Sequence, residues 1–217
     1  MDIDLRTPLS LRSSFAFPLQ TPLARREVVW GAVLLLVPGV GWILNMGHRI
    51  ALVHNMLHGR DAWPAWRDHG ALFRHGLVTF GGMLYYHLPS FAVGWLAWRT
   101  GSAALWAASV VLSLLAIIAI PGYMTHYCHA FDAREIYSPA RALSRVAEGG
   151  RAYWHAWGIA LAALALSFVG LLGLGVGFLA TSVWFWQVAG FSFARVFSRK
   201  LLATPHPAES HVPAIVR

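Results

Sequence analysis

The sequence predicts an all-α integral membrane protein: a polytopic helical bundle with a broken or re-entrant helical pair, four transmembrane helices and interfacial amphipathic helices. Composition is the first reason, because 57% of the 217 residues are hydrophobic and 12% are charged, whereas about 25% of a soluble domain is charged. The second reason is that four long stretches contain no Asp, Glu, Lys or Arg: Val28–His48, Gly76–Trp98, Thr100–Phe131 and Ala152–Ala194. About 20 helical residues cross a bilayer, so each stretch is long enough for a crossing.

The first uncharged stretch predicts the broken pair. Val28–Val37 is followed by Pro38-Gly39-Val40-Gly41, and Trp42–Leu57 then continues with helical periodicity. This pattern fits either one kinked crossing or a hairpin of two short helices. Arginines lie on both sides of the stretch, and short loops rich in Lys and Arg stay on the cytoplasmic side of a membrane. We therefore expect the hairpin, with both flanks and both termini cytoplasmic.

The other stretches predict the four crossings, at roughly Gly76–Trp98, Ser102–Ile120, Tyr153–Val169 and Val176–Phe197. Pro89 should kink the first of them, since proline frees a carbonyl inside a helix. Pro121 should end the second, and a cluster of glycines between residues 170 and 177 should form the last turn. Ala140–Val146 is expected to form an interfacial helix, because its apolar residues share one face.

The ends of the chain differ from this apolar region. We expect residues 1–26 to form a cytoplasmic N-terminal arm, either an amphipathic segment in the membrane interface or a flexible tail. Residues 27–200 should form the helical membrane domain. Residues 201–217 contain three prolines and no long apolar run, which indicates a flexible C-terminal tail.

The formal net charge of +8 indicates contact with anionic lipid head groups, each basic residue contributing about 1 kcal/mol near the surface. Nucleic acid is not an expected partner, because the basic residues are spread over loops and do not form one stripe. Ion pairs and interfacial tryptophans should instead build a platform for the membrane surface or a partner. Its expected members are Arg49, Arg60, Asp61, Trp63, Trp66, Arg67, Arg74, Arg134, Glu135, Arg141 and Arg145, with Asp68 pairing to the nearby arginines.

Two pairs of histidines have spacings that suit a metal. His54 and His58 share one helical face, as do His126 and His129, with Cys128 between the latter two. Neutral imidazole is a common transition-metal ligand. However, no acidic residue stands beside His54 or His58 to orient the rings, as is usual around a metal. We therefore expect interfacial histidines bonded to backbone or lipid phosphate, and no metal.

His87 and His155 fall within or at the edge of apolar spans, where an ionisable group needs a partner. Pro89 cannot donate to the carbonyl of Tyr85, so we expect His87 to satisfy that kink by a hydrogen bond. A proton relay and an axial ligand to haem or chlorophyll are the alternatives for both histidines.

The order of motifs resembles the domain of unknown function 4013 family of bacterial and archaeal membrane proteins. The motifs are Gly47-His48-Arg49, Leu57-His58-Gly59-Arg60-Asp61, Trp63-Pro64-Ala65-Trp66, Tyr86-His87-Leu88-Pro89, Phe131-Asp132-Ala133-Arg134-Glu135-Ile136 and Tyr153–Trp157. The resemblance extends from about Glu27 to Val196, with departures at His48, Trp63 and Ala65. It implies the architecture described above, and it brings no reaction, ligand or catalytic residue.

These observations together predict a non-enzymatic accessory or scaffold subunit of the bacterial cytoplasmic (inner) membrane, which packs against other integral membrane subunits. A respiratory or photosynthetic complex is one setting for such a subunit. No cofactor is expected, which leaves bound lipid or a neighbouring pigment open. The alternatives are a small oligomeric transporter or channel and a histidine-dependent metal or haem enzyme.

Overall fold

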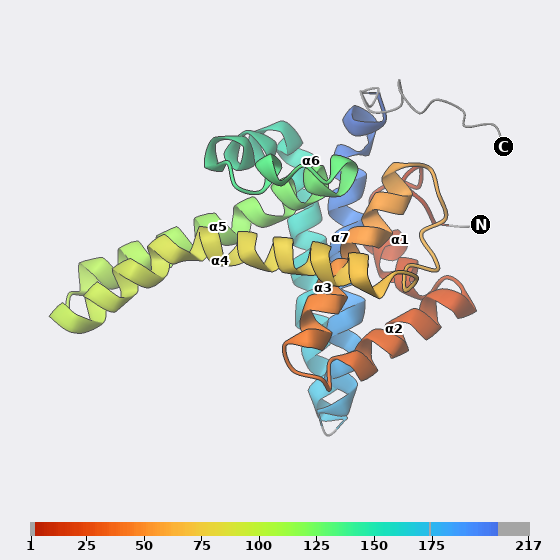
Figure 1. The fold of residues 1–217 in the computed structure, drawn as a ribbon, viewed down its shortest axis with the longest axis horizontal. Coiled ribbons are helices and arrows are strands. Elements are labelled where there is room, and N and C mark those ends of the chain that lie inside the picture. The colour runs from red at the N-terminus through yellow and green to blue at the C-terminus, as the bar shows by residue number, and fades with distance from the viewer. Residues whose placement is uncertain (1–2, 174, 204–217) are drawn as a thin grey trace.

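The computed structural model describes residues 3–173 and 175–203, which are helical without strands (Figure 1). The α-helices are α1 Leu11–Ala16, α2 Pro22–Leu34, α3 Val40–Leu57, α4 His69–Thr100, α5 Ala103–Ala130, α6 Pro139–Ser167 and α7 Val176–Ala203. Three short 3-10 helices join them: η1 Phe17–Leu19, η2 Ala133–Glu135 and η3 Phe168–Leu172. The all-α prediction is thus confirmed for the described residues.

Within the described part of the chain, three helical segments are long and apolar enough to cross a membrane: Ala103–Ala130, Pro139–Leu172 and Val176–Ser198. They contain three of the four predicted crossings. The fourth predicted crossing, Gly76–Trp98, lies inside α4, which is long enough to cross a membrane but is not one of these three segments. Its polar segment Tyr85-Tyr86-His87 lowers its hydropathy.

Side-chain caps explain where several helices begin. Thr21 accepts a hydrogen bond from the backbone N–H of Ala24, with Pro22 in the first turn of α2. Asp68 caps α4 and Ser102 caps α5 in the same way. Such caps satisfy backbone N–H groups that have no partner inside the helix.

The α2–α3 pair breaks at the predicted place. Pro38 and Gly39 lie in the turn between the two helices, and Gly39 has a φ of 77°, which glycine adopts without strain. The depth of this pair in a membrane stays a prediction.

Helix α5 does not end at Pro121, so this prediction was wrong. The helix continues to Ala130. Pro121 has no N–H to donate to the carbonyl of Ile117 one turn earlier, and helices tolerate this where nearby groups bond the backbone around the proline. Next to that position, the Tyr153 hydroxyl of α6 donates to the carbonyl of Ile118, and the Thr125 hydroxyl of α5 itself donates to the carbonyl of Pro121.

Helix α6 unites two predicted elements. The expected interfacial helix Ala140–Val146 and the expected crossing Tyr153–Val169 follow one another on it, separated by a bend at Gly150, where φ is 52°. The amphipathic part of the chain therefore turns directly into the apolar part.

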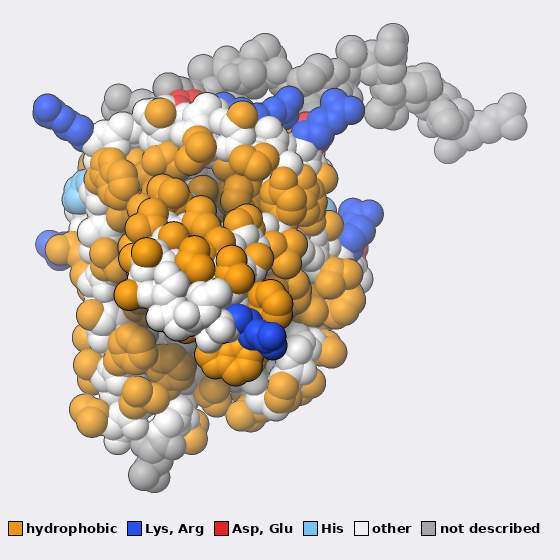
Figure 2. Space-filling view, turned by 90° about the vertical axis from the view of Figure 1, so that its left-hand side faces the viewer, with side chains coloured by type: hydrophobic (Ala, Val, Ile, Leu, Met, Phe, Trp, Pro, Cys, Tyr) orange, Lys and Arg blue, Asp and Glu red, His pale blue; other side chains and the backbone are white. Residues whose placement is uncertain are grey.

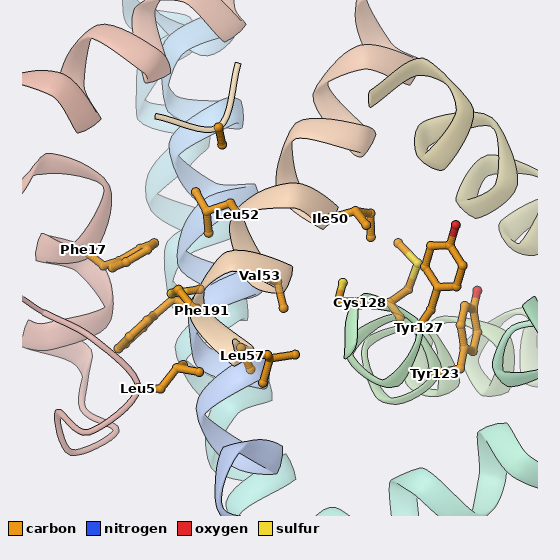
Figure 3. Close-up of a cluster of buried hydrophobic side chains, with 14 of the residues drawn as sticks. Leu5, Phe17, Ile50, Leu52, Val53, Leu57, Tyr123, Tyr127, Cys128 and Phe191 are labelled. Carbon is orange, nitrogen blue, oxygen red and sulfur yellow. The ribbon is translucent and has the colours of Figure 1, made fainter. Parts of the chain in front are cut away.

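Both predicted domain boundaries fall inside helices. The boundary at 26/27 lies within α2 and the boundary at 200/201 lies within α7, which extends to Ala203. Residues 204–217 of the predicted C-terminal tail lie outside the described residues. The described part of the N-terminal arm packs against α7, where the rings of Phe17 and Phe191 stack with centroids 4.6 Å apart (Figure 3). The arm is therefore part of the helical domain.

Helix α3 lies at the centre of the main core. Phe17 and Phe191 lie on one side of it, and Tyr123 and Tyr127 of α5 lie on the other (Figure 3). Two glycines bring α3 against α4: a Cβ on Gly47 would lie 1.8 Å from the carbonyl oxygen of Leu72, and a Cβ on Gly76 would be equally obstructed. Backbone therefore meets backbone where these helices cross.

The long helices form two hairpins that diverge. In Figure 1, α4 and α5 run together away from the other helices, whereas α6 and α7 run side by side in another direction. Figure 2 shows the face toward which the α4–α5 hairpin points, and hydrophobic side chains dominate it. This arrangement leaves much of the hairpin without neighbours from its own chain.

Candidate functional site

A buried carboxylate joins three segments of the chain. Glu27 of α2 is 5% exposed, and its Oε2 accepts a hydrogen bond from Nε2 of His48 on α3 over 2.8 Å. Both carboxylate oxygens also lie within 2.9–3.1 Å of the backbone N–H of Ala65, in the loop before α4. We call Glu27, His48 and Ala65 the carboxylate clamp.

Aromatic rings enclose the clamp. The His48 ring stacks on Trp66 with centroids 4.2 Å apart, and the Trp66 indole N–H donates to the backbone carbonyl of Glu27. Trp63 is 8% exposed and packs against Phe17 and His48. Trp63 is thus buried beside the clamp, whereas Trp66 is half-buried and keeps part of its ring at the surface; a contact of these two rings with the membrane stays a prediction.

Sequence reasoning did not identify Glu27 as a site residue. The signal available was an acidic residue at the very start of an uncharged stretch, where a carboxylate needs a partner if it is buried. His48 is 21 residues away and Ala65 is 38 residues away, so no local spacing connects them.

A second group of rings lies where α3 and α5 end. His54 and His58 are in contact, with centroids 4.1 Å apart, and His58 stacks on His129 at 5.4 Å. Phe131 stacks on His54 at 4.3 Å and on His75 at 4.1 Å. We call these five residues the histidine cluster; His75 was not predicted to belong to it.

Backbone carbonyls orient these imidazoles. His54 donates from Nδ1 to the carbonyl of Cys128 over 2.7 Å, and His58 donates from Nδ1 to the carbonyl of His54 over 2.9 Å. Burial lowers the pKa of His54 to about 4, and the nearby His58 and Arg60 act in the same direction, whereas the bond to Cys128 opposes them. His54 is therefore neutral at pH 7.

The predicted His126–His129 pair does not act as a unit. His126 is buried, donates from Nδ1 to the carbonyl of Gly122 and contacts the ring of Phe197. Within residues 3–173 and 175–203, no group of three or more His, Cys, Asp or Glu side chains has a metal-binding arrangement. Three of the four candidate histidines, His54, His58 and His129, do meet, through ring contacts.

The structure does not bring His87 and His155 together. His87 donates from Nδ1 to the carbonyl of Met83 over 2.8 Å and lies against Phe91. The imidazole does not bond to the carbonyl of Tyr85, so the predicted hydrogen bond at the Pro89 kink was wrong. Its acceptor lies one turn before His87 itself. His155 lies exposed on α6.

The predicted platform divides into several parts. Glu135 lies between Arg141 and Arg145, at 3.1 Å and 3.2 Å, and Arg145 also reaches Glu148 at 2.8 Å. This network joins η2 to α6; Glu135, Arg141 and Arg145 were expected members of the platform, but their pairing was not predicted. Arg60, Asp61, Arg67, Arg74 and Arg134 are exposed.

One expectation about the platform was wrong. Asp68 makes no ion pair among the described residues; its carboxylate caps α4 by accepting from the N–H of Ala71. Arg49 is half-buried, unlike the exposed arginines, and its guanidinium lies over the Trp186 ring of α7, 4.7 Å from the centroid.

Chemically, the carboxylate clamp can fix a loop and the histidine cluster can fix the end of α3 against α5. Comparisons with protein-family models, curated proteins and solved structures found no match. The resemblance to the domain of unknown function 4013 family stays a prediction.

Proposed function

We propose that this protein is a non-catalytic accessory or scaffold subunit, embedded in a bacterial cytoplasmic membrane and packed against other integral membrane proteins through its α4–α5 hairpin. The three long apolar helices support the membrane location. The proposal places both termini on the cytoplasmic side, following the arginine-rich segments, and counts α4 as a fourth crossing.

The exposed α4–α5 hairpin is the observation that carries the proposal. Only 17% of the most apolar part of α5 is buried within the protein, compared with 50% for α7. Large apolar side chains on both helices of the hairpin are about half exposed, among them Leu88, Phe91, Trp95, Val110 and Leu114. A hairpin with so few intramolecular neighbours must be covered by lipid or by another protein.

Small residues favour a helical partner. Ala103, Ala104, Ala107 and Ala108 near the start of α5 are all exposed. Helices in membranes associate mainly through close packing, and small side chains let the backbones approach. An exposed row of alanines therefore suits contact with a transmembrane helix better than contact with flexible lipid chains.

The hairpin is also stiff enough to act as a docking element. The Ser90 hydroxyl donates to the carbonyl of Ser109, and the Ser109 hydroxyl donates to the carbonyl of Ser90, both over 2.9 Å. These reciprocal bonds link α4 and α5 midway along the projecting part.

Site-specific photo-crosslinking in native membranes tests the proposal. We would place benzoylphenylalanine at Leu88 or Val110 of the hairpin, and at Leu161 of α6 as a control; Val110 and Leu161 are both 55% exposed. The expected result is one and the same integral membrane subunit, identified by mass spectrometry, crosslinked from both hairpin positions and not from Leu161. Crosslinks to lipid alone, or equal capture of many proteins from all three positions, would refute it.

A further inference from the structure

A cavity of about 450 Å³ lies between α3, α4 and α7. Its walls are mainly apolar, with Leu35, Met46, Met83, Phe178 and Val183 among them. Trp42 and Trp186 also line it, and they are 55% and 43% exposed. Cavities of about 300–1,000 Å³ with apolar walls and a few polar groups are typical of small-molecule sites.

Gln187 is a polar group in the cavity wall without an internal partner. Its side chain is 1% exposed, and neither Nε2 nor Oε1 has a hydrogen-bond partner in the described part of the chain. A buried polar atom without a hydrogen-bond partner destabilises the folded protein. Gln187 therefore offers an N–H donor and an oxygen acceptor that no described residue engages, in a side chain that lines the cavity.

Arg49 adds a cation to the same cavity. Its methylene groups pack near Gly190, and its guanidinium lies over Trp186. No hydrogen bond or ion pair of this side chain is seen among residues 3–173 and 175–203. A guanidinium carries five N–H donors, and their geometry suits a carboxylate or phosphate.

Glu27, the acidic residue of the carboxylate clamp, makes no ion pair with Arg49. Glu27 is held by His48 and by the N–H of Ala65. His48 also lines the cavity, and its bond to Glu27 fixes this part of the wall. The cavity thus combines an unpaired cation, an unpaired amide and an apolar lining.

We propose that this cavity binds a single-chain anionic amphiphile. The oxyanion accepts hydrogen bonds from Arg49 and from the Gln187 amide N–H, and the hydrocarbon chain lies along the apolar wall formed by α3, α4 and α7. A carboxylate or a phosphate monoester satisfies this requirement, and the protonated oxygen of a phosphate monoester can in addition donate to Oε1 of Gln187. The site is independent of the hairpin surface on which the scaffold proposal depends.

Direct binding to the full chain tests this proposal. The protein is reconstituted in nanodiscs of neutral phosphatidylcholine, and binding of radiolabelled oleate and of radiolabelled oleoyl lysophosphatidate is measured. Methyl oleate has the chain without the charge, and inorganic phosphate has the charge without the chain. We expect at least one of the two anionic amphiphiles to bind at least tenfold more tightly than either of these comparison compounds, and the tighter one identifies the headgroup.

Two substitutions assign the binding to the cavity. Arg49→Met keeps the apolar stem and Gln187→Met keeps the volume, and each should weaken amphiphile binding about tenfold or more. Arg99→Met is the matched control, because Arg99 also lies over a tryptophan, Trp95, but away from the cavity, with 5.8 Å between guanidinium and ring centroid. Circular dichroism and thermal unfolding show which variants remain folded.

The results either support or overturn the inference. Loss of binding in folded Arg49→Met and Gln187→Met with retention in Arg99→Met supports it. Unchanged binding in either cavity variant, equal loss in Arg99→Met, equal binding of methyl oleate, or binding of inorganic phosphate alone overturns it. If Arg49→Met does not fold, Gln187→Met decides the question.

Discussion

Removing the carboxylate of Glu27 should destabilise the protein strongly. Glu27→Ala leaves two buried donors without an acceptor, the His48 Nε2–H and the Ala65 backbone N–H. Each unpaired buried donor costs about 1–3 kcal/mol. For the two donors together we expect the free energy of unfolding to fall by about 2–6 kcal/mol. Glu27→Gln retains one oxygen acceptor and should cost about 1–3 kcal/mol.

The measurement is reversible unfolding by titration with dodecyl sulfate in mixed micelles, followed by tryptophan fluorescence. Trp63 and Trp66 lie beside the clamp, so their emission should report its opening. Asp61→Ala is the control, because Asp61 is an exposed carboxylate in the same loop and its loss should change stability by no more than about 0.5 kcal/mol.

A double-mutant cycle separates the hydrogen bond from general loss of packing. His48→Phe keeps a ring against Trp66 and removes the N–H donor. The coupling between Glu27→Ala and His48→Phe should be about 1.5–3 kcal/mol, the range for a hydrogen bond to a charged group. A loss below about 0.5 kcal/mol for Glu27→Ala, or strictly additive single variants, would refute the reasoning.

Three further outcomes follow from the packing of the helices. Gly47→Ala should place a methyl group against the α4 backbone and lower the free energy of unfolding by about 1–3 kcal/mol or more. Gly158→Ala is the control, because the new methyl group has open space there and should be neutral or slightly stabilising. Equal effects of the two substitutions in the same unfolding assay would contradict this prediction. Burial lowers the pKa of His54 from 6.5 to about 4, so the unfolded chain binds the proton more readily and the stability of the folded protein should fall as the pH drops through this interval. Thermal unfolding at pH 7 and pH 5 should show a smaller loss of stability in His54→Gln than in the unsubstituted protein. An equal loss in both proteins would contradict this prediction. Ser90→Ala removes one of the two reciprocal bonds to Ser109 and should lower the free energy of unfolding by about 0.6–1.7 kcal/mol, measured in the same unfolding assay. No change would show that the stability of the hairpin does not depend on this bond.

Features that depend on local chemistry could be predicted from the sequence. The break at Pro38-Gly39 and the glycine turn before Val176 follow from backbone preferences, and the structure places helix ends close to both. The all-α class follows from composition and from the long uncharged stretches.

Features that depend on distant contacts could not be predicted. Helix α5 continues past Pro121, and the Tyr153 hydroxyl that bonds the backbone beside this proline lies 35 residues from its acceptor, Ile118. Trp63 was expected at a membrane surface because aromatic rings favour that position, but Phe17 and His48 provide an internal place for it.

In the candidate sites, too, contacts within one helix could be predicted and contacts between distant segments could not. Spacing on one helix placed His54 and His58 together correctly. The carboxylate clamp needed three segments that only the tertiary fold brings together. Arg49 was grouped with neighbouring arginines on grounds of charge, yet its position on α3 directs it to Trp186 of α7.

The contact between the N-terminal arm and α7 constrains the order of assembly during synthesis. Trp184 donates to the carbonyl of Phe15, and Arg195 donates to the carbonyl of Thr7, across sequence separations of 169 and 188 residues. Translation proceeds from the N-terminus at about 5–20 residues per second, so α7 leaves the ribosome roughly ten to forty seconds after the arm. During that interval the apolar ring of Phe17 has no Phe191 to stack on. The arm must therefore wait for α7, and closure of this part of the fold is coupled to the synthesis of that helix.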